Sequence, residues 1–115
     1  MTKSHVEHVV PIIAGTLKAI LDKQPGPNRH HHFFVTAEVE AEIDWKIKLV
    51  AAEPQGINPL EEILRFDVVV PPGIHSDAIA RRTVRYEESP PGADYRDVLL
   101  HDGKETARAR VEIVV

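Results

Sequence analysis

Three consecutive histidines, residues 30–32, stand directly before a stretch of alternating apolar and polar residues. If that stretch is a β-strand, His30 and His32 lie on the same face, where two imidazoles can reach one metal ion. His5 and His8, three residues apart, could supply two further ligands. Imidazole nitrogen suits zinc, copper and nickel. The pattern therefore raises the hypothesis of a site for a divalent metal such as zinc, formed by His30, His32, His5 and His8.

A second interpretation of the histidines needs no metal. They would be exposed to solvent at the start of the strand, where an imidazole can be neutral or charged near neutral pH. We favour this interpretation, because a His-x-His pair without a second ligand pair of established spacing is weak support for a metal site. The metal hypothesis stays open beside it, and with it the question of whether the protein is an enzyme.

Arginine side chains form a second candidate site. Arg81 and Arg85, together with Arg108 and Arg110, could make a cationic face that binds a phosphate, a carboxylate or an acidic segment of a partner. The alternative is a solvated surface on which these cations pair with the many glutamates. His101 lies near several aspartates and could take part in acid–base chemistry, although aspartates in this position are also typical of turns.

Composition limits the classes of function. The chain has 14 lysines and arginines against 18 aspartates and glutamates, and this net charge of −4 argues against binding to nucleic acid. It has no cysteine, which excludes disulfides and thiolate zinc ligands and favours a reducing compartment, so we expect a cytoplasmic protein. Pro11 and Gly15 interrupt the apolar stretch near the beginning of the chain, so we expect neither a signal peptide nor a membrane span. Glycine-rich phosphate loops and the common hydrolase and metalloprotease motifs are also missing from the sequence.

The elements that would position these residues begin with an N-terminal helix. Apolar residues recur at spacings of three and four over residues 4–23, which is the pattern of an amphipathic helix. They are Val6, Val9, Val10, Ile13, Leu17, Ile20 and Leu21. The start of the helix is open, because Ser4 and Glu7 match a capping box whereas Pro11 fits best at the first helical position. We predict a firm helix from about Pro11.

The clearest pattern lies between Phe33 and Ala51. Every odd residue there is apolar and the even residues are mostly polar, which indicates pleated backbone with one face on the core and one in water. An unbroken strand of this length would run to roughly 70 Å, far beyond a domain with a radius of gyration of about 13 Å. Because the odd residues stay apolar from Glu40 to Asp44, we expect a loop of odd length or a bulge there, with Trp45 facing the core.

Further elements follow toward the C-terminus. Asn58 and the two residues after it indicate the start of a short helix. Residues 65–70 and 83–87 alternate as strands, and Asp102-Gly103 is typical of a two-residue turn in a β-hairpin. In that hairpin the numbers of directly opposed residues would sum to 205, which sets Asp97 against Arg108.

A short stretch resembles a known family. The predicted helix, the Pro-Gly turn and then His31-His32-Phe33-Phe34-Val35-Thr36 look like the opening of the stringent starvation protein B family, whose members are adaptors that deliver tagged chains to a protease. The strands after Asp44 do not follow that family's pattern. No binding residue is carried over from it.

These patterns predict one α+β domain over residues 1–115, in which an N-terminal helix packs on an antiparallel sheet of about five strands that ends in a C-terminal β-hairpin. Residues 111–115 are apolar on more than one side, and an exposed strand edge of that kind invites pairing with another chain. We therefore expect a homo-oligomer, and a small non-catalytic binding or adaptor module whose partner is a protein or peptide. A small metal-dependent or acid–base enzyme built on the histidines is the alternative.

Overall fold

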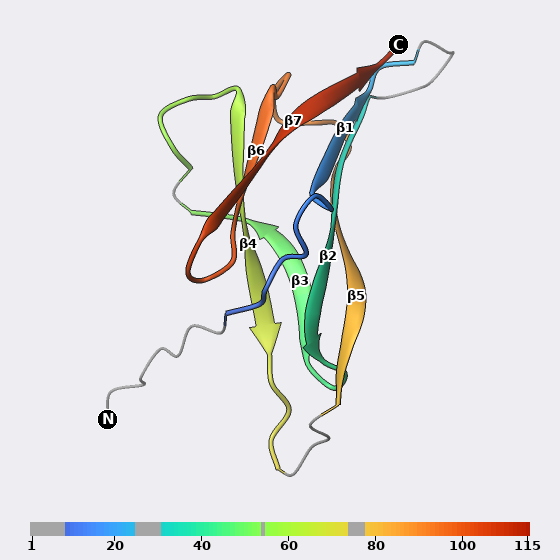
Figure 1. The fold of residues 1–115 in the computed structure, drawn as a ribbon. Helices are drawn as coiled ribbons and strands as arrows, with labels where there is room; N and C mark the ends of the chain where they lie inside the picture. Colours follow the sequence, from blue (N-terminus) through green and yellow to red (C-terminus); the bar gives the residue numbers. More distant parts are fainter. Residues whose placement is uncertain (1–8, 25–30, 54, 74–77) are drawn as a thin grey trace.

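The computed structural model describes residues 9–24, 31–53, 55–73 and 78–115, and every regular element in these ranges is a β-strand. Figure 1 shows the seven strands along the chain. Their bounds are β1 (Lys18–Asp22), β2 (His32–Glu42), β3 (Lys46–Ala51), β4 (Glu61–Val69), β5 (Ile79–Glu88), β6 (Asp97–His101) and β7 (Thr106–Val114). None of the described ranges contains a helix that could cross a membrane.

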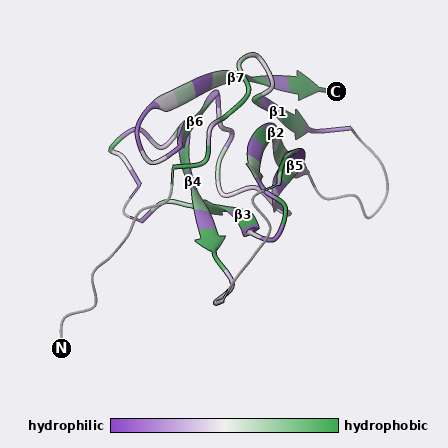
Figure 2. Cartoon of the chain, turned by 60° about the horizontal axis from the view of Figure 1, so that its bottom comes forward, coloured by the Kyte–Doolittle hydropathy of each residue, from purple (hydrophilic) through white to green (hydrophobic). Residues whose placement is uncertain are grey.

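The strands form one mixed sheet in the order β3-β4-β6-β7-β1-β2-β5. β1 and β7 run parallel, as do β4 and β6, and the remaining neighbours are antiparallel. The two outer strands, β3 and β5, lie side by side, so that the sheet curls into a nearly closed, barrel-like form (Figure 2). β7 makes this curl possible, because its residues 106–110 pair with β6 and its residues 111–114 pair with β1.

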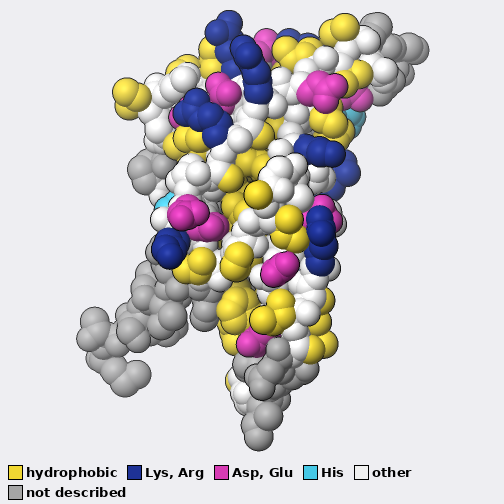
Figure 3. Space-filling model, viewed as in Figure 1, with side chains coloured by type: hydrophobic (Ala, Val, Ile, Leu, Met, Phe, Trp, Pro, Cys, Tyr) yellow, Lys and Arg dark blue, Asp and Glu magenta, His cyan; other side chains and the backbone are white. Residues whose placement is uncertain are grey.

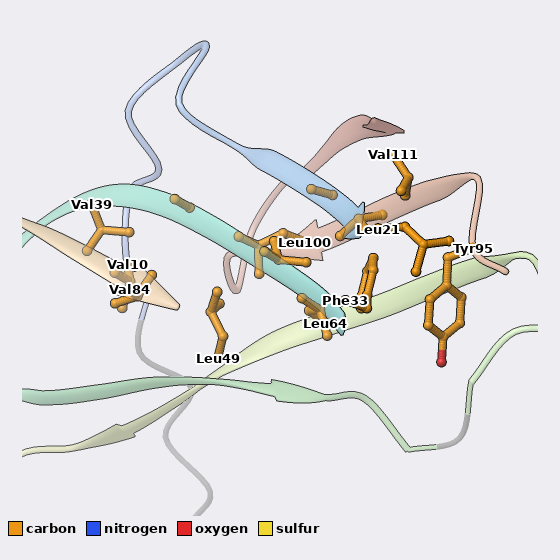
Figure 4. Packing of buried hydrophobic residues seen from close by; sticks show 14 of the residues in the cluster. Val10, Leu21, Phe33, Val39, Leu49, Leu64, Val84, Tyr95, Leu100 and Val111 are labelled. Carbon is orange, nitrogen blue, oxygen red and sulfur yellow. The ribbon is translucent and has the colours of Figure 1, made fainter. Parts of the chain in front are cut away.

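Apolar side chains from both halves of the sheet fill the interior. In β2 every second residue from Phe33 to Ala41 is buried, which confirms the predicted alternation. The largest side chains with almost no exposed surface are Phe33, Leu21, Leu64, Leu100, Val10, Val35, Val39 and Val98 (Figure 4). Burying each of them contributes about 1.5–3 kcal/mol relative to leaving it in water, so this cluster is the main source of stability.

The bend inside the long alternating stretch is a loop of three residues, 43–45, between β2 and β3. The predicted odd-length loop is therefore confirmed, and Leu49 faces the interior as the odd residues of β2 do. Trp45 is half-buried and packs against the core, as predicted. The Arg82 side chain reaches the loop from β5 and donates hydrogen bonds to the carbonyl oxygens of Glu42 (3.1 Å) and Trp45 (2.6 Å).

The predicted N-terminal helix is wrong, and with it the α+β class. Residues 9–17 are irregular and β1 follows; residues 1–8 lie outside the description. The irregular segment crosses from the β6–β7 hairpin to β2 (Figure 1), where Ile13 N–H donates to Glu38 O (2.8 Å) and Glu40 N–H donates to Pro11 O (3.2 Å). Pro11 and Gly15, whose φ is 79°, both interrupt helical hydrogen bonding, so these backbone groups pair with β2 instead.

The short helix predicted at Asn58 is also absent. Asn58 forms a turn, because its side-chain Oδ1 accepts the Leu60 N–H (3.0 Å) and its carbonyl oxygen accepts the Glu61 N–H (3.2 Å). β4 begins at Glu61. A side chain that bonds to the nearby backbone in this way offers an alternative to the helix it was predicted to cap.

The C-terminal hairpin forms, but its register is two residues away from the predicted one. Asp97 faces Arg110, so opposed residue numbers sum to 207 and the loop holds four residues, 102–105. The Asp102 side chain accepts hydrogen bonds from the N–H groups of Lys104 (2.8 Å) and Glu105 (2.6 Å). These bonds stabilise a loop wider than the two-residue turn that Asp102-Gly103 usually makes.

Val10 offers a test of the N-terminal segment as part of the core. Its side chain is completely buried, whereas that of its neighbour Val9 is 44% exposed. We expect Val10→Ala to lower the free energy of unfolding by about 2 kcal/mol, because it deletes buried methyl groups and leaves a cavity. Urea denaturation of both variants measures the effect, with Val9→Ala as the matched control. Equal losses at the two positions would contradict the packing described above.

Candidate functional site

Two carboxyl groups and two tyrosines meet inside one end of the barrel, and we call this group the carboxyl clamp. It consists of Glu62 on β4, Tyr86 and Glu88 on β5, and Tyr95 in the segment between β5 and β6. Glu62 is only 4% exposed. It shares the inward face of β4 with Leu64, and Tyr86 and Glu88 continue the face of Val84 on β5, so strand alternation points all of them inward.

The hydrogen bonds of the clamp converge on Glu88. Its Oε1 accepts from the Tyr95 hydroxyl (2.9 Å) and from the Gly92 N–H (2.7 Å), and its Oε2 accepts from the Tyr86 hydroxyl. The Tyr86 hydroxyl also lies 3.3 Å from Glu62 Oε1, between the two carboxyl groups. The Tyr95 ring packs against Phe33 at 4.7 Å between ring centroids, and Figure 4 shows it among the core residues.

The two carboxyl groups hold their protons differently. Burial, together with the hydrogen bond to Glu88 and its charge, raises the pKa of Glu62 to about 7. Burial also disfavours the charge on Glu88, but hydrogen bonds from Glu62, Tyr86, Gly92 and Tyr95 outweigh it and lower the pKa of that carboxyl group. Burial first, and then Glu88, raises the pKa of both tyrosines. Below neutral pH the pair therefore carries one shared proton, which resides on Glu62.

A carboxyl pair that shares one proton can serve as a general acid and base. In this clamp the Glu88 carboxylate already accepts hydrogen bonds from two tyrosine hydroxyls and the Gly92 N–H, and Glu62 is almost completely buried. The clamp joins β4, β5 and the segment that carries Tyr95 through a buried network of hydrogen bonds.

Gly92 fits the clamp because it lacks a side chain. A Cβ atom at this position would lie 2.7 Å from the Tyr95 hydroxyl oxygen and 3.3 Å from Glu88 Oε1. The backbone of Gly92 can therefore approach the carboxylate closely enough to donate its N–H.

The predicted metal site falls largely outside the described residues. His5, His8 and His30 are not described, and His32 is exposed on the outer face of β2, where its Cα pairs with that of Asp22 on β1. Within the described ranges, no three histidine, aspartate or glutamate side chains gather to hold a metal ion. The four-histidine site stays a prediction.

The predicted arginine site is spread over two strands, with β1 and β2 between them. Arg81 and Arg85 lie on the outer face of β5, and Arg108 and Arg110 lie on that of β7. Glutamates bind three of the four guanidinium groups, in the pairs Arg81–Glu38 (2.9 Å), Arg85–Glu87 (2.8 Å) and Arg108–Glu61 (3.1 Å). Figure 3 shows the resulting surface, on which basic and acidic side chains lie next to one another.

His101, the remaining acid–base candidate, contributes to the hairpin loop. Its Nδ1 lies 3.2 Å from the Thr106 hydroxyl oxygen, and the neighbouring Asp102 side chain is occupied by backbone donors. Asp94 forms an ion pair with Lys23 at 3.3 Å, on another part of the surface. Asp102 therefore stabilises the loop next to His101, and Asp94 makes a surface contact elsewhere.

The other feature with functional potential is the C-terminal half of β7. Residues 111–114 pair with β1, and no described strand pairs with them on their other side. Val111 N–H donates to Arg96 O (2.7 Å) at the point where pairing with β6 ends. Beyond that point Ile113 is 53% exposed and Val115 is 83% exposed. We call the unpaired side of residues 112–115 the β7 edge.

Sequence reasoning missed the carboxyl clamp, although one signal for it was present. Glu62 precedes Leu64, Phe66 and Val68 in steps of two, so extending the strand backwards would have placed it on the buried face. Glu62 was instead assigned to the helix predicted to begin at Asn58, so this alternation was not extended to it.

No protein-family model, no curated protein and no solved structure matches this chain. The resemblance to an adaptor family, which included the predicted N-terminal helix, the Pro-Gly turn and residues 31–36, gains no support from these comparisons, and that helix is absent from the described residues. Function must therefore be argued from the geometry alone.

The clamp predicts a specific dependence of stability on pH. Because the pKa of Glu62 is higher in the folded chain than the ordinary 4.5, its stabilising contribution is complete below pH 4.5 and is lost as pH rises through about 7. A neutral amide can replace the protonated carboxyl group, so Glu62→Gln should become more stable than the natural chain as pH rises through this window. Each unit of pKa difference corresponds to about 1.4 kcal/mol. The largest gain in the free energy of unfolding is therefore about 3 kcal/mol.

Thermal and urea denaturation between pH 4 and pH 9 measure this gain. The exposed Glu53 provides a matched control, and Glu53→Gln should follow the natural chain at every pH. A constant difference between Glu62→Gln and the natural chain across the range would show that no shared proton is present.

The contribution of Tyr95 can be separated from the packing of its ring. Tyr95→Phe keeps the contact with Phe33 but removes one donor to the Glu88 carboxylate, so we expect a loss of about 2 kcal/mol in the free energy of unfolding. In a Glu88→Gln background the same substitution should cost clearly less, because the acceptor is then uncharged. Equal costs in the two backgrounds would mean that the hydroxyl does not act through the Glu88 carboxylate, and no cost in either background would mean that Tyr95 stabilises the protein only by packing.

Proposed function

We propose that this chain is a non-catalytic binding module that takes up an extended polypeptide segment by strand addition at the β7 edge. The observation that carries the proposal is the one-sided pairing of β7 beyond Val111, next to the exposed side chains of Ile113 and Val115. Strand addition to an open sheet edge is a common mode of peptide recognition, in which main-chain hydrogen bonds supply affinity.

Backbone direction supports the proposal. In a strand, the N–H and C=O of one residue point to the same side, and those of the next residue point to the other. Val114 O accepts the Lys23 N–H (2.7 Å) and so points toward β1, whereas Val111 N–H points toward Arg96. Ile113 lies two residues after Val111, so its N–H and C=O point away from β1, into the β7 edge.

The two outer strands of the sheet face each other, although no backbone ladder joins them in the described ranges. β3 and β5 lie side by side, and the Ile43 N–H donates to Ala78 O (3.1 Å) where the β2–β3 loop meets the beginning of β5. The Arg82 side chain donates hydrogen bonds to the carbonyl oxygens of Glu42, at the end of β2, and of Trp45 in this loop. The β7 edge combines unpaired backbone groups with two exposed apolar side chains, Ile113 and Val115. β4 beyond Arg65 also pairs on one side only, and its Val69 is exposed.

The interior supports a binding role over a catalytic one. Apolar side chains fill it, and the buried carboxyl groups are bonded to one another and to tyrosines. Glutamates of the same sheet bind three of the four arginines of the predicted cationic face. An unpaired strand edge beside exposed apolar side chains suits an extended peptide.

A blocked synthetic peptide with the sequence of residues 110–115 is a suitable probe, because it carries the alternating side chains of a strand. We expect it to shift the amide signal of Ile113 in NMR spectra of the labelled protein and to slow exchange of that amide with water. Ile113→Lys should abolish the effect, because a charge on an edge strand opposes pairing. Ile79→Lys is the matched control, since Ile79 is 68% exposed on β5. Binding that is unchanged by Ile113→Lys, or no binding at all, would refute the proposal.

A further inference from the structure

We infer that the segment bound at the β7 edge is the same segment of a second copy of this chain, so that two copies join through antiparallel β7 strands around a two-fold axis. This inference rests on the proposed function and names its partner. It follows from the self-complementary chemistry of the β7 edge, which presents one complete donor and acceptor pair at Ile113, flanked by residues that tolerate their own counterparts.

The register is determined by Ile113. In an antiparallel pair, two directly opposed residues can exchange both of their N–H to C=O hydrogen bonds. Ile113 is the residue within β7 beyond Val111 whose two backbone groups point outward; Val115 has the same parity but follows the end of the strand. A two-fold axis placed there therefore sets each Ile113 opposite its counterpart, with one hydrogen bond in each direction.

The side chains agree with this register. Glu112 would face the counterpart of Val114, and Val111 would face that of Val115, so no charged residue directly opposes a like charge. The two Ile113 side chains, each 53% exposed in the single chain, would cover one another. Apolar pairs of β-branched residues across strands are among the favourable ones.

One repulsive contact remains, between the two Glu112 side chains, and it can be used to test the register. The two Glu112 side chains would lie on the same face at the diagonal positions of the pair, where separations are about 7–8 Å. Glu112 is exposed, so the repulsion is modest and is screened by salt. This contact is expected when the partner is a second copy, because that copy brings its own Glu112 to the diagonal position.

Sedimentation analysis of the full chain over a wide range of concentrations tests the inference. We expect a monomer–dimer equilibrium, and a dimer dissociation constant raised about tenfold or more by Ile113→Pro, which removes the outward N–H without removing a bond to β1. Circular dichroism and thermal melts confirm that the variant folds. In addition, the peptide of residues 110–115 should dissociate the dimer of the natural chain, a measurement that needs no substitution.

A charge exchange tests the register itself. Glu112→Arg mixed with the natural chain should form more mixed dimer than the statistical half, because opposite charges then meet across the diagonal. A dimer that shows no such preference, or that persists unchanged in Ile113→Pro, would be formed by another surface and would overturn the inference.

The two proposals fail in different ways. If the natural chain stays monomeric at the highest concentration while the peptide still binds at Ile113, the second copy is not the partner and the binding function stands. If neither the peptide nor a second copy binds at Ile113, both proposals are wrong.

Discussion

The structure depends on how β7 shares its backbone hydrogen bonds between two neighbours. Its first half pairs with β6 and its second half with β1, which joins the two parts of the sheet and lets β3 and β5 approach one another. Each buried backbone group must find a partner, and the curled sheet satisfies this requirement around an apolar interior. The same division leaves the second half of β7 with one neighbour, so the feature that closes the barrel also creates its open edge.

The carboxyl clamp lies directly beside that division. Glu88 holds the Tyr95 hydroxyl inside the barrel, and the next residue, Arg96, accepts the last hydrogen bond that β7 makes on its outer side, from Val111. The clamp thus holds the segment at which pairing between β6 and β7 ends. Two buried carboxyl groups are compatible with a stable core here because they share a proton and leave a single charge, which several donors solvate.

Candidate sites differed in how far sequence could predict them. Arg81 and Arg108 were identified as surface cations, but their glutamate partners are 43 and 47 residues away, and only the strand pairing brings them together. The β7 edge was anticipated from the apolar residues 111–115, since an apolar strand end is visible in sequence. Glu62 was missed because its burial depends on β4 beginning three residues after Asn58, at a turn that local preferences assign equally well to a helix.

The sequence by itself determined the pleated stretch from Phe33 to Ala51, the odd-length loop within it and the C-terminal hairpin, because a two-residue alternation and a turn dipeptide are local signals. Tertiary structure decided the conformation of residues 9–22. Their apolar spacing suits a helix, yet their backbone groups pair with β2 and β7, which lie far away in the chain. The hairpin register follows from the local hydrogen bonds of the Asp102 side chain, which the turn dipeptide did not predict. Tertiary structure also decided the parallel pairs and the meeting of Glu62 with Glu88. Each of these depends on contacts between distant residues, whose energies outweigh local preferences of a few tenths of a kcal/mol to about 1 kcal/mol per residue.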